Sequence, residues 1–269
     1  MAAAVTITVV GLIIGVLLGL LGGGGAILAV PALVYLIGLP VTQAIPMSLI
    51  VVAAAALSGA YTRVRERLIN WRLAAIFAAA GMPAAALGTV VGRNVPQDVL
   101  LAGFAILMIA AGIRMVRKPA HVGTACTTVD PGTGVPKVNW RRCTSRSIPA
   151  GLGVGFVTGL FGVGGGFVVI PALVLLLGIT MPVAVGTSLV VIAANASAGL
   201  IGYIGTVSLD LTLTALFAAA AIIGSFAAGR LSARVSGDKL QRWFAYLVFV
   251  VAAAIAIELT VRTAMGLFA

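Results

Sequence analysis

The pattern that decides the fold occurs twice in the chain. Residues 11–38 read GLIIGVLLGLLGGGGAILAVPALVYLIG, and residues 151–178 read GLGVGFVTGLFGVGGGFVVIPALVLLLG. The offset is a constant 140 residues, and 20 of the 44 positions from Gly11 to Ala54 are identical to their counterparts. Similarity at a fixed offset is the signature of a duplicated structural unit. The sequence therefore predicts two homologous repeats.

The composition places both repeats in a lipid bilayer. Of the 269 residues, 61% are hydrophobic and only 9% are charged, whereas about a quarter of the residues of a soluble domain are charged. Seventeen Lys and Arg residues against six acids give a net charge of +11, which we interpret as a topology signal and not as a nucleic-acid-binding surface. We predict a multi-pass protein of the cell (inner) membrane with no nucleic-acid partner.

The residue types argue against an enzyme. The chain has one histidine, His121, and few acids, and no nucleophile–base pair can be assembled from it. Cys126 and Cys143 lie in the only long polar stretch, and their spacing matches no zinc site. We therefore expect no catalytic residue, no metal and no cofactor, and free thiols if this stretch is cytoplasmic. A pore, a carrier or a scaffold remains.

The 140-residue offset also aligns the ends of the repeats, because it pairs four more identical residues: Val95 with Val235, Asp98 with Asp238, Leu100 with Leu240, and Phe104 with Phe244. We predict three parts: a first transmembrane repeat at 1–118, a polar basic linker at 119–147 and a second transmembrane repeat at 148–269.

Hydropathy predicts a long first segment in each repeat, followed by three ordinary spans. The first segments are 4–38 and 148–178, and the spans are 43–61, 73–92, 98–116, 183–203, 210–229 and 239–261. A straight helix over 4–38 would reach about 50 Å, which exceeds a hydrocarbon core of about 30 Å. The glycine clusters at 22–25 and 162–166 are the places for a break. We expect an all-α membrane fold with about 8 hydrophobic segments, and half-helices that resume near Ala26 and Phe167.

The basic residues predict how the repeats are oriented. They gather at 63–72, 114–146 and 230–242, and the positive-inside rule places all three stretches in the cytoplasm. If each broken segment crossed once, the repeats would be parallel and 230–242 would lie outside. If each is a hairpin, whether fully spanning or re-entrant, all three stretches lie inside. We therefore predict inverted repeats with both termini outside, and the sequence leaves both kinds of hairpin open.

The doubled Gly-x-x-x-Gly-Leu-(Leu/Phe)-Gly-x-Gly-Gly pattern, followed by Pro-Ala-Leu-Val, a glycine and Ala-x-x-x-Ser-Leu, resembles the sulfite exporter TauE/SafE family. The resemblance covers essentially the whole chain. It implies a bacterial-type inner-membrane carrier of small sulfur-containing anions, such as sulfite, sulfoacetate or related organosulfonates, without enzymatic activity. The family name suggests export, and it does not say which anion this member carries.

The residues favour an anion site on their own terms. A helix that restarts inside the membrane exposes backbone N–H groups at its N-terminus, and these suit an anion without any charged side chain. Hydroxyl and amide side chains at membrane depth add further donors. The predicted substrate-binding residues are Gly22, Gly23, Gly24, Gly25, Ser48, Gly162, Gly164, Gly165, Gly166, Thr187, Ser188 and Asn195.

Several of these polar and small residues have a structural alternative. Serine hydroxyls often bond to a carbonyl one turn back, and Asn195 fits a helix–helix hydrogen bond equally well. The spacing of Gly11, Gly15 and Gly19 is typical of tight helix packing.

Pro31 and Pro171 are expected to kink or start the second half-helix. The bases at Arg63, Arg65 and Arg67 are expected to set topology and contact lipid headgroups, or else to form an anion vestibule.

We therefore predict a secondary transporter for a small anion that works by alternating access between inverted repeats. An anion channel and a non-transporting membrane scaffold are the alternatives. The expected partners are the anion and the lipid bilayer, and a homo-oligomer is left open.

Overall fold

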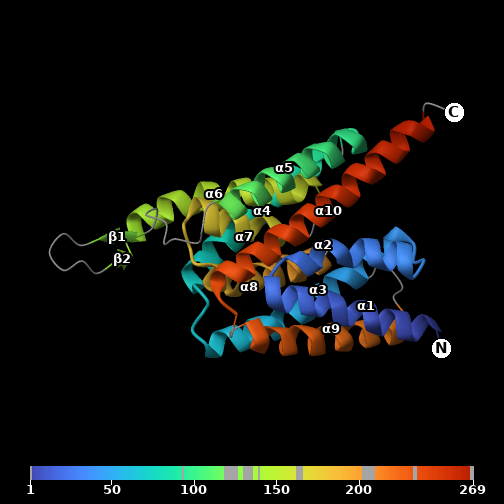
Figure 1. Cartoon of the computed structure of the whole chain (residues 1–269), viewed down its shortest axis with the longest axis horizontal. Helices are drawn as coiled ribbons and strands as arrows, with labels where there is room; N and C mark the ends of the chain where they lie inside the picture. The colour runs from blue at the N-terminus through green and yellow to red at the C-terminus, as the bar shows by residue number, and fades with distance from the viewer. Residues whose placement is uncertain are drawn as a thin grey trace.

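Helices make up nearly all of the described chain (Figure 1). The computed structural model describes residues 2–92, 94–117, 127–129, 136–138, 140–161, 166–201, 210–232 and 235–266. Within these ranges there are ten α-helices, two short π-helical turns and one small pair of strands. The predicted all-α membrane fold is confirmed.

The two repeats have the same order of elements. The first contains α1 (Ala2–Leu21), α2 (Gly24–Pro31), η1 (Ala32–Leu36), α3 (Val41–Arg65), α4 (Trp71–Gly92) and α5 (Gln97–Arg117). The second contains α6 (Trp140–Phe161), α7 (Gly166–Pro171), η2 (Ala172–Leu176), α8 (Met181–Ile201), α9 (Leu211–Ser232) and α10 (Gly237–Gly266). The α1-to-α5 series is thus repeated as α6 to α10.

The linker between the repeats holds more regular structure than its polar composition indicates. Strands β1 (Thr127–Val129) and β2 (Pro136–Val138) pair in antiparallel fashion, with Thr128 opposite Lys137. Helix α6 begins at Trp140, so the last part of the segment predicted as linker, up to residue 147, is helical.

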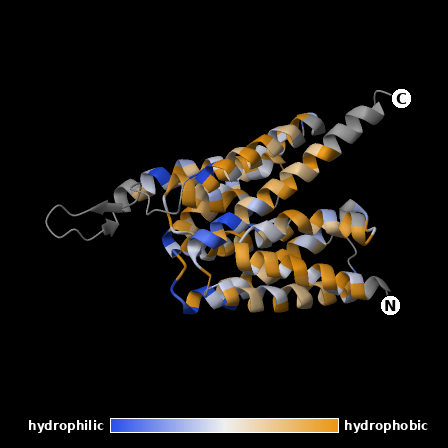
Figure 2. Ribbon diagram, in the orientation of Figure 1, coloured by the Kyte–Doolittle hydropathy of each residue, from blue (hydrophilic) through white to orange (hydrophobic). Residues whose placement is uncertain are grey.

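The predicted spans agree with the observed helices to within a few residues. Five helices of the described chain are long and apolar enough to cross a membrane: Gln43–Arg65, Trp71–Gly92, Met181–Leu200, Leu211–Ser232 and Gly237–Ile257. Two shorter apolar helices, Val5–Leu21 and Gly24–Val34, form the first segment. Apolar residues cover the helices along their length (Figure 2).

The first segment breaks at Gly22–Gly23 and turns back on itself. Gly22 has a φ of 73°, a left-handed conformation that glycine adopts without a steric penalty. Helix α2 then packs against α1, because a Cβ on Gly25 would lie 2.4 Å from the Ile14 carbonyl oxygen. Figure 1 shows α2 running in the direction opposite to α1. The segment is a hairpin, and α2 begins at Gly24, earlier than the expected Ala26.

The two prolines of the repeated pattern end a half-helix and do not start one. Helix α2 ends at Pro31 and α7 ends at Pro171, and each continues directly into a π-helical turn. Proline has no N–H and its ring disturbs the preceding turn, so a change of helix type at this point follows from the sequence. Of the two alternatives expected for these residues, a kink or the start of the half-helix, the structure contains a local disturbance of the helix and not a start.

The first helix of each repeat packs against the fourth helix of the other repeat. A Cβ on Gly15 would lie 2.1 Å from the Ala221 carbonyl oxygen, so α1 and α9 touch through their backbones. A Cβ on Gly159 would lie 1.9 Å from the Ala85 carbonyl oxygen, and this joins α6 to α4. The prediction of tight packing for Gly11, Gly15 and Gly19 is confirmed, since all three face α9.

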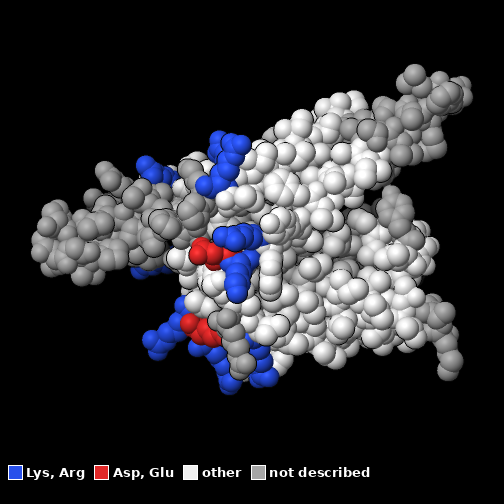
Figure 3. Space-filling view, viewed as in Figure 1, with Lys and Arg blue, Asp and Glu red and all other residues white. Residues whose placement is uncertain are grey.

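The repeats are inverted. Helix α1 and its counterpart α6 run in opposite directions, and α1 begins at the end of the bundle where α10 finishes (Figure 1). The Lys and Arg residues gather at the other end (Figure 3). Bases in the last turns of α3, α5 and α9 contribute to this charge, and the positive-inside argument predicted that the bases gather at one end.

One expectation about the linker is wrong. Cys143 is buried, 1% exposed, and disulfide-bonded, so it is not the free thiol that we expected. Cys126, for which the same expectation was made, lies outside the described residues, as does His121.

Candidate functional site

The break in the first repeat is closed by a helix of the second repeat. The Gly22 N–H donates to the Leu18 carbonyl at 2.7 Å and ends α1. Ser188 Oγ on α8 lies 3.3 Å from the Gly22 carbonyl oxygen and 2.9 Å from the Val185 carbonyl oxygen. The serine hydroxyl donates its proton to these two carbonyl oxygens in a shared hydrogen bond. A Cβ on Gly22 would lie 2.8 Å from that hydroxyl. Glycine is therefore required at this contact by space as well as by conformation.

The N-terminus of α2 is buried and has no side-chain cap. Gly23 occupies the N-cap position and makes no side-chain hydrogen bond to the helix. Gly24, Gly25 and Ala26, which follow it, are all buried. The first backbone N–H groups of a helix have no partner within the helix, and together with the helix dipole they favour an anion.

Arg63 is enclosed beside this break. Its side chain is 0% exposed, and it donates from Nη1 to the Pro182 carbonyl at 3.1 Å and from Nη2 to the Gly19 carbonyl at 3.4 Å. Nη2 also donates to Ser232 Oγ. Buried arginines normally have a paired carboxylate, yet the nearby Glu66 is exposed. The partners of Arg63 are instead groups near helix ends, where α1 and α9 finish and α8 begins.

This environment corrects our expectation for Arg63. A base that only contacts lipid headgroups lies on the surface, whereas this guanidinium lies between α1, α3, α8 and α9. The C-terminal ends of α1 and α9 carry partial negative charge, which stabilises a cation there. Arg63 Nε is buried and has no hydrogen-bond partner among the described residues. Arg65 and Arg67, in contrast, are exposed as expected.

Thr187 holds the loop between α3 and α4. It is 0% exposed, and its Oγ1 accepts a hydrogen bond from the Asn70 N–H at 3.1 Å. Asn70 in turn accepts from the Leu73 N–H through Oδ1 at 3.2 Å, and this caps α4. The hydroxyl predicted as an anion ligand thus also positions the loop that follows Arg63.

The structure brings only part of the predicted site together. Gly22, Gly23, Gly24, Gly25 and Ser188 are grouped at the first break, whereas Thr187, next to Ser188, bonds to the loop between α3 and α4. Ser48, 5% exposed, donates to the Ile45 carbonyl of its own helix at 2.7 Å. It lies fifteen residues before Arg63 on α3, which is about 22 Å at 1.5 Å per residue.

The remaining predicted residues lie elsewhere. Asn195 is seven residues beyond Ser188, about 10 Å along α8, and its Oδ1 is buried without a partner in the described part of the molecule. Gly166 is the first residue of α7. Gly162, Gly164 and Gly165 lie outside the described residues.

Arg63, Asn70 and Ser232 are the residues near the break that sequence reasoning missed. A signal for Arg63 exists, because the buried face of α3 follows helical spacing from Val52 through Ala56 and Gly59 to Arg63. A base that continues such a stripe points into the protein. Asn70 and Ser232 come close to the break only through packing between repeats, and no local pattern predicts them.

Fold and site together define the class as a multi-pass helical membrane protein of inverted repeats. A family model described as sulfite exporter TauE/SafE matches residues 7–255. The chain belongs to this family, which is one of membrane transporters, and the resemblance noted from the sequence is confirmed.

Curated relatives agree with this assignment. A "Probable membrane transporter protein" of Xylella fastidiosa (strain 9a5c) is 34% identical over 243 residues, covering 89% of this chain and 90% of the relative. A "Probable membrane transporter protein YunE" of Bacillus subtilis (strain 168) is 29% identical over 248 residues, covering 86% and 88%. No solved structure matches the chain significantly.

Proposed function

We propose that the protein is a secondary transporter that exports small sulfur-containing anions, such as sulfite or organosulfonates, by alternating access. The observation that carries this proposal is Arg63, a fully buried cation beside the break of a membrane helix. No Asp or Glu is among the buried polar and charged residues of the described ranges. An anion that enters this region would therefore meet a positive charge whose nearby carboxylate, Glu66, is exposed.

The chemistry around the break fits a small oxyanion. An arginine presents a planar fork of donors that matches two oxygens of one anion, and the uncapped amides of α2 add further donors. The Ser188 hydroxyl lies at the same break. Arg63 donates to the Gly19 carbonyl over a long distance, 3.4 Å. A charged oxygen of the anion would readily replace this carbonyl as the acceptor, because hydrogen bonds between two charged groups are stronger.

The inverted repeats support alternating access as the mechanism. Transporters built this way bind substrate at discontinuous helices between the repeats and open to each side by moving one bundle against another. Here Ser188 of the second repeat closes the break of the first, so a relative motion of the repeats would open it.

The test is flux in reconstituted proteoliposomes with sulfite, sulfate, thiosulfate, sulfoacetate and taurine. We expect saturable uptake and counterflow exchange for at least one sulfur-containing anion. Currents of channel size would support the anion-channel alternative. Absence of flux for every anion in a folded protein would favour the scaffold.

The residue-level test compares two neighbouring arginines. We expect Arg63→Gln to lower flux at least about tenfold, because a charge-assisted hydrogen bond contributes roughly 1.5–3 kcal/mol. Arg65→Gln is the matched control, because Arg65 is exposed and stacks over Tyr61 at 5.5 Å from the ring centroid. Arg63→Lys keeps the charge and loses the fork, so we expect an intermediate flux. Equal flux in Arg63→Gln and wild type, at equal folded yield, would contradict the proposal.

A further inference from the structure

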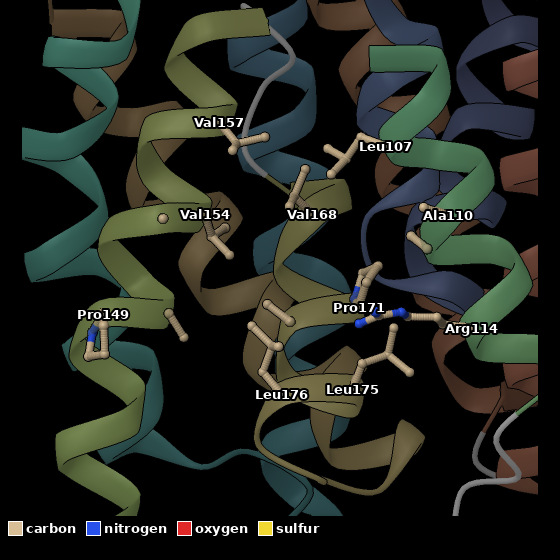
Figure 4. Close-up of a pocket in the computed structure, with 14 residues that line it drawn as sticks. Leu107, Ala110, Arg114, Pro149, Val154, Val157, Val168, Pro171, Leu175 and Leu176 are labelled. Carbon is tan, nitrogen blue, oxygen red and sulfur yellow. The ribbon is translucent and has the colours of Figure 1, made fainter. Parts of the chain in front are cut away.

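A groove lies between α5, α6 and η2, away from the first break. Its volume is about 390 Å³ and its lining is almost entirely aliphatic. Figure 4 shows Leu107 and Ala110 of α5 facing Val154 of α6 and Leu175 of η2 across it. We call this the α5–α6 groove. The one charged residue in its lining is Arg114, whose guanidinium reaches from α5 toward Pro171 and Leu175 (Figure 4).

Small residues of both repeats build the walls of the groove. Ala110 and Ala111 of the first repeat and Gly153 of the second line it, whereas their counterparts 140 positions away are the larger Val250, Val251 and Ile13. There the fifth helix closes on the break, since a Cβ on Gly24 would lie 2.2 Å from Leu247 Cδ2. The repeat counterpart of Arg114 is Ala254. The contact of α5 with α6 therefore combines small wall residues with a base, and the equivalent positions of α10 and α1 carry larger residues and no base.

The groove opens toward the surroundings of the bundle. Gly153 and Ala110 are exposed, and Leu176 is 55% exposed. The neighbouring surface is apolar as well, with Ile106 at 68% and Leu152 at 44% exposure. In a bilayer, hydrocarbon chains are what meets such a surface, so an apolar recess there is filled by lipid.

One end of the groove is basic. Helix α5 runs toward the basic end of the bundle, and Arg114 and Arg117 lie in its last turn. Helix α6 starts at the same end, and Arg146 lies one turn before Pro149 of the groove. From Arg114 back to Leu107 the groove extends about 10 Å into the bundle. Anionic headgroups are attracted to bases at this depth.

We propose that the α5–α6 groove is a binding site for an anionic phospholipid. One acyl chain fills the groove between Leu107 and Pro149, and the phosphate contacts Arg114. The lipid takes the volume that larger side chains occupy at the equivalent positions of α10 and α1. This inference does not depend on which anion is transported.

The experiment counts lipids retained by the purified full-length protein with mass spectrometry under non-denaturing conditions. The protein is equilibrated with phosphatidylglycerol or phosphatidylcholine of the same chain length. We expect wild type to retain phosphatidylglycerol about fivefold more, since one base near the membrane surface contributes about that factor. Arg114→Gln should abolish the preference, and Arg242→Gln, at an exposed base of the same end, should keep it.

The acyl chain is tested by filling the groove. Gly153→Ile introduces the first repeat's residue, and a Cβ at Gly153 has no atom within 4 Å, so the protein should fold. We expect it to retain at least threefold less of both lipids, whereas Ala75→Ile on the exposed surface of α4 should retain as much as wild type. If Gly153→Ile lowers the folded yield, Ala111→Val narrows the same groove. Unchanged retention in the groove-filling variant, or a headgroup preference that persists in Arg114→Gln, would overturn the proposal.

Discussion

Two groups of glycines lie close together in the sequence and serve different purposes. Gly15 and Gly19 lie within a regular helix, and their missing side chains let α1 touch the backbone of α9. Gly22 and Gly23, a few residues later, end that helix, and Gly22 adopts a φ of 73° beside Ser188 and Val185. The first group holds the repeats together, and the second group ends α1 and leaves the N-terminus of α2 without a side-chain cap.

The comparison shows that the role of a glycine depends on the atoms that face it in the folded protein. Gly15 and Gly19, together with Gly159 in the second repeat, face the backbone of another helix. We call these seam glycines, and any atom added to one of them separates two helices. A glycine at the break, such as Gly22, faces side chains, and the fold requires its left-handed backbone conformation. Substitutions in the first group should therefore lower the stability of the fold, whereas substitutions in the second group should mainly lower anion flux.

The largest effect is expected at the seam. Gly159→Ala would place a Cβ 1.9 Å from the Ala85 carbonyl oxygen, and overpacking of this kind costs about 3 kcal/mol or more when backbone must move. We expect a large loss of folded protein, measured by size-exclusion yield and thermal unfolding in detergent. Gly153→Ala on the same helix is the control, because its Cβ meets no atom within 4 Å. Equal stability of the two variants would remove the distinction between seam and open glycines.

A smaller effect on stability and a larger one on function are expected at the break. Gly22→Ala forces a left-handed conformation on alanine, which costs about 1–2 kcal/mol, and presses on Ser188 Oγ at 2.8 Å. We expect a folded protein whose anion flux falls more than about tenfold. Gly38→Ala carries the same backbone strain, with a φ of 77°, but meets no neighbour within 4 Å. If both variants lose flux equally, strain alone explains the loss and the break is not special.

The smallest effect on flux is expected for the serine hydroxyls, and it should differ between the two repeats. Ser188→Ala removes the hydroxyl that lies 3.3 Å from the Gly22 carbonyl oxygen, and one such hydrogen bond is worth roughly 0.5–1.5 kcal/mol. We expect flux to fall about threefold to tenfold. Ser48→Ala, its repeat counterpart, removes a bond to Ile45 of the same helix and should change flux by less than about twofold. An equal loss in both would mean that the two breaks contribute alike.

Much of the fold could be predicted because its signals are local or repeated. Hydropathy places the spans, and the excess length of the first segment requires a break, as Gly22 confirms. The distribution of bases predicts inversion, because positive-inside topology depends on loop charge and not on packing. The interpretation of Gly11, Gly15 and Gly19 as packing residues also rests on helical spacing alone.

The candidate site was predicted less completely. Ser188 is found by the repeat, but its contact with Gly22 joins residues 166 positions apart, and no spacing rule gives such a pairing. The sequence predicts a surface position for Arg63, at lipid headgroups or in an anion vestibule, because bases usually lie at the membrane surface. Its burial depends on three other helices whose ends surround it.

Hydropathy, glycine conformation and loop charge act locally, so the amino-acid sequence alone predicts a membrane protein of two inverted repeats with a broken first helix. Which glycines form seams, that Arg63 lies inside the protein, and that a groove stays open between α5 and α6 beside Arg114 are known only from the packing of the helices. These features depend on contacts between segments that are distant along the chain, and such contacts exist only after the helices of one repeat pack between those of the other.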